Sequence, residues 1–189
     1  MKIIIDAGHG GKDPGACRIK NGKPTYEKDI ALHFAFEIGR RLKARGNTVI
    51  YTRRVDKYIK LEERTDISNR NNADLFISLH CNGYANKDAH GGEIWVSKDA
   101  SDTTREFAKN LFYSLYESHL PLDMRIGDRG LMYKEQNFYV LKHTKAPAVL
   151  IELGFISNDG DFHVLTDSGW VAYYSALIDY AISKHFVEK

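Results

Sequence analysis

The feature that most restricts the fold of this chain is its regular alternation of strand-like and helix-like segments. Apolar runs typical of buried strands are separated by stretches whose apolar residues recur at helical spacing. This alternation favours an α/β fold, in which helices cross over between the strands of a sheet. The runs that we expect to form strands are residues 2–7, 48–52, 74–80, 91–97 and 148–153.

Helical spacing also predicts the elements that connect these strands. Thr103 and Glu106 have the spacing of a capping box, which predicts where one helix begins. Glycines and prolines predict irregular chain between the first strand and about Tyr26, and residues 119–147 have only a loose pattern. The expected helices are residues 29–45, residues 61–73, the segment opened by Thr103, residues 158–165 and a final amphipathic helix from Trp170 to Ala181.

Length and charge limit the class of protein. The chain has 189 residues, which suffices for one α/β domain with a full core, so we expect a single domain over residues 1–189. The net charge of +2 is too balanced to indicate a nucleic-acid partner. No apolar run approaches the roughly 18 residues of a membrane span, so we expect no membrane association. The two cysteines, Cys17 and Cys81, form no recognisable pair and are expected to be free thiols.

Four polar residues stand where the predicted elements would bring them together. His9 follows the first strand, His80 closes the run DLFISLH, and Glu152 lies near the end of the run AVLIEL. If these strands are parallel, their carboxyl ends open onto one edge of the sheet, where α/β proteins place their sites. Glu27 begins from the same edge, because it lies in the first turn of the helix that follows the first loop.

Two imidazoles and a carboxylate are a donor set that suits zinc, with one coordination position left for water. His9, His80 and Glu27 are therefore candidate metal ligands, and Glu152 is a candidate base for the water. Taken singly, each of these residues has an ordinary structural explanation: a loop residue, a hydrogen-bonded core histidine, a carboxylate favoured by a helix dipole, or half of an ion pair. The metal hypothesis depends on the four occurring together.

Motifs along almost the whole chain, from residue 2 to the final helix, make the pattern more specific. In chain order they are DAGHGGKDPGA, EKDIAL, TR (52–53), LEERTDISNRNNADLFISLHCN, GGEIW, DRG (128–130), VLK and PAVLIELGFISN. In this order they resemble the zinc-dependent N-acetylmuramoyl-L-alanine amidases of the Amidase_3 type. These are bacterial cell-wall hydrolases, including autolysins and the catalytic domains of phage endolysins.

The resemblance implies a six-stranded, mostly parallel twisted sheet flanked by helices on both faces. It also implies hydrolysis of the amide between N-acetylmuramic acid and L-alanine in peptidoglycan, with Zn²⁺ as cofactor. Peptidoglycan is then the partner, and the enzyme acts on the cell wall, at the extracellular or periplasmic face. We expect a monomer. Because KIII leads directly into the first motif, we expect no signal peptide, so the protein is released by lysis or another route, or its leader has been removed.

The resemblance also implies roles for individual residues. It maps the zinc ligands of the family onto His9, Glu27 and His80, and its catalytic glutamate onto Glu152. Two more residues, Asn82 and Arg129, fall in motifs near the site. They are candidates for binding substrate or supporting the site.

The chain departs from some or many members of the family in two informative ways. Some members carry a helical insertion, after the strand that matches GGEIWVS, which covers the metal until a partner removes it. Here Ser97 is followed within a few residues by the next predicted helix, so we expect an open site. The chain also shows no wall-binding repeats, which predicts either that the catalytic domain itself binds the wall or that a binding segment has been trimmed.

Two other functions compete with this prediction. A wall-binding module that has lost catalysis would lack a ligand or the base, and this chain lacks neither. A zinc peptidase or deacetylase would share the metal chemistry and cleave a different bond. The absence of the HExxH helix of many zinc peptidases disfavours that alternative.

Overall fold

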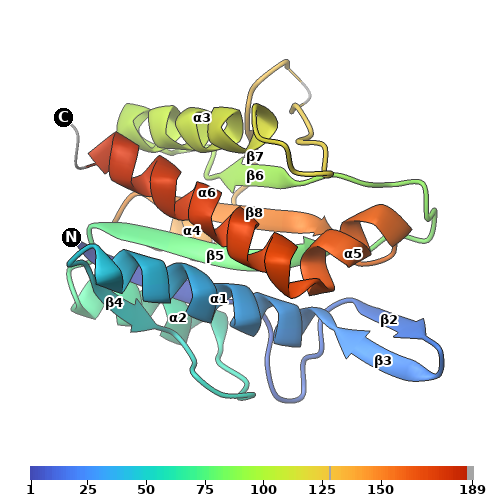
Figure 1. Ribbon diagram of the computed structural model, residues 1–189. Coiled ribbons are helices and arrows are strands. Elements are labelled where there is room, and N and C mark those ends of the chain that lie inside the picture. The colour runs from blue at the N-terminus through green and yellow to red at the C-terminus, as the bar shows by residue number, and fades with distance from the viewer. Residues whose placement is uncertain (128, 187–189) are drawn as a thin grey trace.

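The computed structural model, which describes residues 1–127 and 129–186, places six strands in one sheet (Figure 1). All neighbouring strands are parallel except β6 and β8, which run antiparallel. This confirms the predicted α/β class and the mostly parallel sheet. Across the sheet the strands are β4 (Thr48–Tyr51), β1 (Lys2–Ala7), β5 (Leu75–Asn82), β8 (Ala148–Phe155), β6 (Glu93–Val96) and β7 (Lys134–Glu135).

Helices cover both faces of the sheet. On one face α1 (Glu27–Ala44), α6 (Ser168–Phe186) and α3 (Asp102–Tyr116) pack side by side, as Figure 1 shows. On the other face α2 (Leu61–Arg70) packs against β1 and against α4 (Tyr139–Lys142), which also contacts β8. The short helix α5 (Asp159–Thr166) follows β8 and packs against α6.

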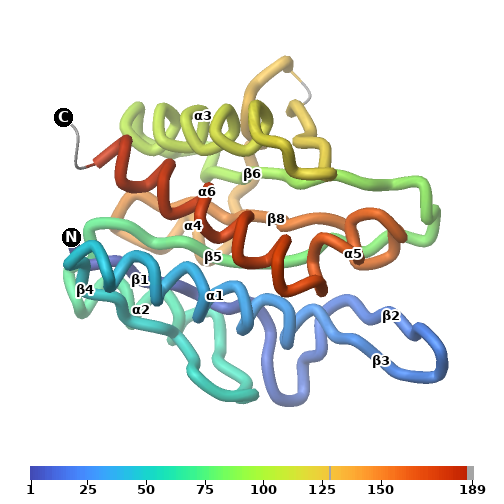
Figure 2. The backbone as a smooth tube through the Cα atoms, viewed as in Figure 1, coloured from blue at the N-terminus to red at the C-terminus, as the bar shows by residue number. Residues whose placement is uncertain are grey.

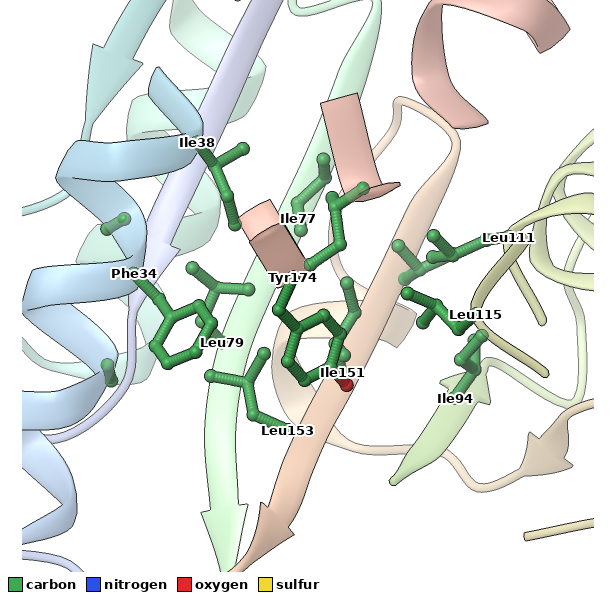
Figure 3. Close-up of a cluster of buried hydrophobic side chains, with 14 of the residues drawn as sticks. Phe34, Ile38, Ile77, Leu79, Ile94, Leu111, Leu115, Ile151, Leu153 and Tyr174 are labelled. Atoms are coloured by element: carbon green, nitrogen blue, oxygen red, sulfur yellow. The ribbon is translucent and has the colours of Figure 1, made fainter. Parts of the chain in front are cut away.

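The main core lies between the sheet and the helices α1, α3 and α6 (Figure 3). Ile77 and Leu79 of β5 and Ile151 and Leu153 of β8 point into it, and all four are fully buried. Burying side chains of this size stabilises the fold by about 1.5–3 kcal/mol each. Because successive residues of a strand face opposite ways, this core forces the intervening side chains onto the other face, towards α2 and α4.

The intervening side chains at the carboxyl ends of β5 and β8 are polar. Deeper in the sheet the same face carries a smaller apolar cluster, which includes Phe76, Leu150 and Val140. Towards the end of the strands the alternation places His80 and Glu152 on this face. The periodicity that builds the core therefore also directs these two groups to a common edge.

One element was missed by the sequence analysis. Two short antiparallel strands, β2 (Cys17–Lys20) and β3 (Lys23–Tyr26), form a hairpin where irregular chain was predicted, and it extends away from the sheet beyond the start of α1 (Figure 2). Asn21 and Gly22 form its turn with φ angles of 51° and 72°. An Asn-Gly pair is the preferred sequence for such a two-residue turn, so the chain did carry the signal.

Several predicted boundaries are shifted. The capping box at Thr103 and Glu106 is wrong: α3 begins at Asp102, and Ser101 caps it by accepting a hydrogen bond from the Thr104 N–H at 3.2 Å. The loose region 119–147 contains the two-residue strand β7 and the short helix α4. The helix predicted over residues 61–73 ends at Arg70.

The expectation for the cysteines holds. Both cysteines are free, with Cys17 exposed and Cys81 buried. Among the residues that the structure describes, no helix combines the length and apolarity needed to cross a bilayer.

Candidate active site

Three parallel strands deliver polar side chains to one edge of the sheet. His9 lies in the turn that follows β1, while His80 and Glu152 lie directly opposite each other on the paired strands β5 and β8. Glu27 is the first residue of α1 and is buried beneath the same edge. The structure thus brings together the four residues that the sequence analysis singled out.

Three of these residues direct ligand atoms at a common point. The Nε2 atom of His9 lies 2.9 Å from Oε1 of Glu27, and Nδ1 of His80 lies 2.9 Å from the same oxygen. The two imidazole nitrogens are 3.1 Å apart. Among the described residues these three side chains form a group able to hold a metal ion.

The triangle fits zinc. Ligands at 2.0–2.1 Å from a tetrahedral ion lie roughly 3.3 Å from one another, close to the separations seen here. Two nitrogens and one carboxylate oxygen are also a donor set that zinc accepts, and three protein ligands leave a fourth position for water or substrate.

Backbone amides hold the Glu27 carboxylate in place. Its Oε2 accepts a hydrogen bond from the Ala16 N–H at 2.7 Å, and its Oε1 accepts one from the Cys81 N–H at 3.0 Å. Burial on its own would raise the pKa of Glu27, but hydrogen bonds and charges from His80 and His9 outweigh it and hold the pKa far below its ordinary value. Glu27 is therefore ionised at neutral pH, as a metal ligand must be.

Close approach of the backbone explains the glycines of the first motif. A Cβ atom on Gly8 would lie 2.4 Å from the His80 ring, and one on Gly15 would lie 2.4 Å from Oε2 of Glu27. Both positions must therefore lack a side chain for the rings and carboxylate to meet. His9 itself has a φ of 56°, a left-handed conformation, and its ring lies 4.8 Å from the His80 ring between centroids.

Two buried arginines bind the backbone carbonyls of this turn. Arg53 donates a hydrogen bond to the Gly8 carbonyl at 2.7 Å, and Arg64 donates one to the His9 carbonyl at 2.7 Å. Arg64 also forms a buried ion pair with Asp6 at 2.7 Å. Breaking a buried pair leaves an uncompensated charge, so losing either Arg64 or Asp6 is expected to destabilise the turn strongly.

Asp13 is a site residue that the sequence analysis missed. Its Oδ2 lies 2.8 Å from Nδ1 of His9, the ring nitrogen that faces away from Glu27. A carboxylate in this position keeps the proton on Nδ1 and leaves Nε2 free to bind an ion. Without a metal, burial would lower the pKa of His9, but hydrogen bonds and charges from Glu27 and Asp13 raise it to about 8, so an ion that binds Nε2 must displace a proton from it.

Replacing Asp13 by Asn is expected to weaken zinc binding by about 10–100-fold, the usual effect of losing the partner that orients a metal-bound histidine. Competition with a chelator of known affinity measures this. Asp29→Asn, which removes an exposed carboxylate from the first turn of α1, is the matched control and should bind zinc like the parent chain. Equal zinc affinity of both variants would contradict the role given to Asp13.

Glu152 differs from Glu27 in the surroundings of its carboxyl group. Its Oε2 is buried and has no hydrogen-bond partner among the described residues. Burial raises the pKa of Glu152 to about 7; the charge of His80 opposes this shift, as does that of His9, while the charges of Glu27 and Glu93 add to it. A carboxyl group with this pKa accepts and returns protons near neutrality, which is the property of a general base.

Glu152 faces a cavity of about 350 Å³ that it lines together with His9 and His80. The side chains of Tyr58 and Leu61, which are 40% and 51% exposed, also line it. The cavity therefore combines the candidate metal ligands and base with an apolar wall that is open to solvent.

The two further candidates have different surroundings. Asn82 follows His80 on β5 after a break in strand register, and its buried Nδ2 has no partner among the described residues. Arg129 is exposed and donates a hydrogen bond to Glu135 at 3.3 Å, away from the residues that line the cavity. Asp128 of the same DRG motif lies outside the described residues.

Comparison with known proteins agrees with this geometry. Residues 3–184 match the family Amidase_3, described as N-acetylmuramoyl-L-alanine amidase. The uncharacterised Bacillus subtilis protein YqiI is 38% identical over 161 residues, which cover 84% of this chain and 72% of YqiI. The probable cell wall amidase LytH of Staphylococcus aureus is 36% identical over 165 residues, which cover 87% of this chain and 51% of LytH.

Among solved structures, an N-acetylmuramoyl-L-alanine amidase from Clostridium difficile 630 superposes with a TM-score of 0.89 at 28% identity, covering 100% of this chain and 97% of that one. The present chain spans about half the length of LytH but nearly the whole of this structure. The family match extends over almost the entire chain and includes every residue of the candidate site. The chain therefore belongs to the Amidase_3 family of N-acetylmuramoyl-L-alanine amidases.

Proposed function

We propose that this chain is a zinc-dependent hydrolase of the amide bond between N-acetylmuramic acid and L-alanine in peptidoglycan, and that it acts at the cell wall as a monomeric catalytic domain. The observation that carries the proposal is the convergence of His9, Glu27 and His80 on one point beside the buried carboxyl of Glu152. Membership of the amidase family supplies the substrate class.

His9, Glu27 and His80 would hold the zinc ion, which when bound supplies a Lewis acid for the carbonyl oxygen and lowers the pKa of water to near 7. Asp13 orients the His9 ring, and the amides of Ala16 and Cys81 orient Glu27.

Glu152 performs the proton transfers. It takes a proton from the attacking water as the new C–O bond forms at the lactyl carbonyl. It then gives this proton to the nitrogen of L-alanine as the C–N bond breaks, so that the amine leaves in its neutral form. Among the described residues no hydrogen bond holds Oε2, and Glu152 lines the same cavity as His9 and His80.

Access to the site supports the expectation that it is open. The side chains of His9 and His80 remain 23% and 21% exposed, and the cavity they line reaches solvent beside Tyr58 and Leu61. A substrate attached to a polymer can therefore approach without a prior rearrangement of the described residues.

Digestion of purified peptidoglycan tests the proposal. We expect new amino groups on L-alanine, intact glycan strands, loss of activity with a chelator and recovery when zinc is added back. A new N-terminus on any other residue would identify a zinc peptidase instead. Binding to the wall without release of any product would identify a binding module.

A further inference from the structure

A second group of charged side chains lies on the far side of Glu152 from the histidines. In the sheet, Glu152 pairs with His80 on one neighbouring strand and with Glu93 of β6 on the other. Directly paired residues lie on the same face with Cβ atoms about 4.5–5.5 Å apart. His80, Glu152 and Glu93 therefore form a row across three strands, and whatever lies around Glu93 borders the reaction centre.

Two cations converge on the carboxylate of Glu93. Lys134 Nζ lies 2.9 Å from Glu93 Oε1, and Arg125 Nη1 lies 3.5 Å from the same oxygen. Among the described residues neither cation has a further ion pair, so one carboxylate faces two positive charges. The 3.5 Å separation is too long for a strong hydrogen bond, which leaves the Arg125 guanidinium with free donors.

Arg125 is held in position although its side chain is 43% exposed. Its backbone N–H donates to the Gly92 carbonyl at 2.8 Å, which ties the loop to the start of β6, and its guanidinium lies 5.3 Å from the centre of the Phe155 ring. Lys134 lies over the Trp95 ring at 5.1 Å. Packing thus fixes both cations, and the exposed Arg125 guanidinium keeps donors that a ligand can reach, which are the properties of a preorganised anion site.

The other side of Glu152 has a different character. There the cavity is lined by Tyr58, Leu61 and Tyr139, which offer apolar surface. An uncharged sugar with its apolar ring face suits this wall, whereas an anionic peptide suits the cations. The scissile amide would then lie over Glu152, between the two surfaces.

We propose that Arg125 and Lys134 form a subsite that binds the free carboxylate of the second residue of the stem peptide; this rests on the proposed function. An extended chain advances about 3.3–3.6 Å per residue, so a carboxylate one residue beyond L-alanine lies about 7 Å from the scissile nitrogen. Neighbouring strands lie about 4.8 Å apart, so the side chains of Arg125 and Lys134, which lie past Glu93, itself on the strand next to Glu152, are within this reach. The subsite makes the enzyme selective for stems whose second residue is a free acid over stems in which it is an amide.

A matched pair of muramoyl tripeptides, identical except for a carboxylate or a carboxamide on the second stem residue, tests this subsite. The parent enzyme should cleave the carboxylate substrate with the lower KM. Arg125→Ala should raise that KM about tenfold with little change in kcat, and should leave the carboxamide substrate unaffected. Arg125→Lys should recover part of the loss, and added salt should raise the KM of the carboxylate substrate only.

The control is Arg40→Ala, which removes an exposed cation of α1 that pairs with Glu37. It should match the parent enzyme on both substrates. Equal loss by Arg125→Ala on both substrates, or no loss on either, would overturn the subsite while leaving the amidase proposal intact. Failure of the parent enzyme to cleave either tripeptide or whole peptidoglycan would instead overturn the proposed function.

Discussion

Replacing Glu152 by Gln is expected to lower kcat on peptidoglycan by roughly 10²–10⁴-fold, the usual contribution of a general base. The introduced amide would keep the shape of the side chain and would be unable to accept the proton of the attacking water. Because Glu152 is not one of the three convergent ligands, zinc content should stay at the level of the parent chain. Turnover on purified walls and metal analysis of the same sample measure the two effects.

A control separates loss of the base from a general effect of removing a carboxylate. Glu37→Gln changes a side chain on α1 that pairs with Arg40 at the surface, and it should retain full turnover. If Glu152→Gln released product at a near-normal rate, another group would have to move the proton. The assignment of Glu152 would then be wrong even if the metal site were correct.

Replacing His80 by Ala is expected to abolish both zinc binding and activity. Loss of an outer partner of a ligand weakens a metal site by 10–100-fold, so loss of a ligand should weaken it by well over about 100-fold. The His9–Glu27 contact at 2.9 Å remains in the variant, so we expect it to stay folded. Metal content after dialysis and the circular dichroism spectrum report binding and folding separately.

His33→Ala is the matched control for this second variant. His33 lies on α1, the helix that begins with Glu27, but it is exposed and is not part of the ligand triangle. It should bind zinc like the parent chain. Full zinc content in His80→Ala would show that the ion is bound elsewhere. The proposal that His9, Glu27 and His80 hold the zinc would then be wrong.

Much of the site could be predicted because it depends on the ends of elements. The apolar runs that end in His80 and near Glu152 marked two strands, and parallel strands bring their carboxyl ends to one edge. Glu27 was placed by the start of a helical pattern. These signals are local in the sequence. The topology of an α/β sheet then brings the marked residues close together in space.

The remaining features depend on geometry that local patterns do not encode. The contact between Asp13 and His9 requires the left-handed backbone at His9, which a sequence pattern does not specify. The cluster at Glu93 requires β6 to run antiparallel to β8, and an apolar run does not reveal its own direction. The β2–β3 hairpin is an exception, because its Asn-Gly turn was a local signal; its strands are short and largely exposed, without the alternation that marks a half-buried strand.

The position of β8 in the sheet bears on how the protein is made. This strand comes from the last quarter of the chain, yet it lies between β5 and β6 and joins the two sides of the sheet. During synthesis, residues 9, 27 and 80 leave the ribosome long before residue 152 does. Until β8 emerges, the β6–β7 pair has no neighbouring strand that joins it to the rest of the sheet. A nascent or truncated chain that stops before β8 thus has neither a finished sheet nor the candidate base Glu152, so we expect it to be unable to cut the wall.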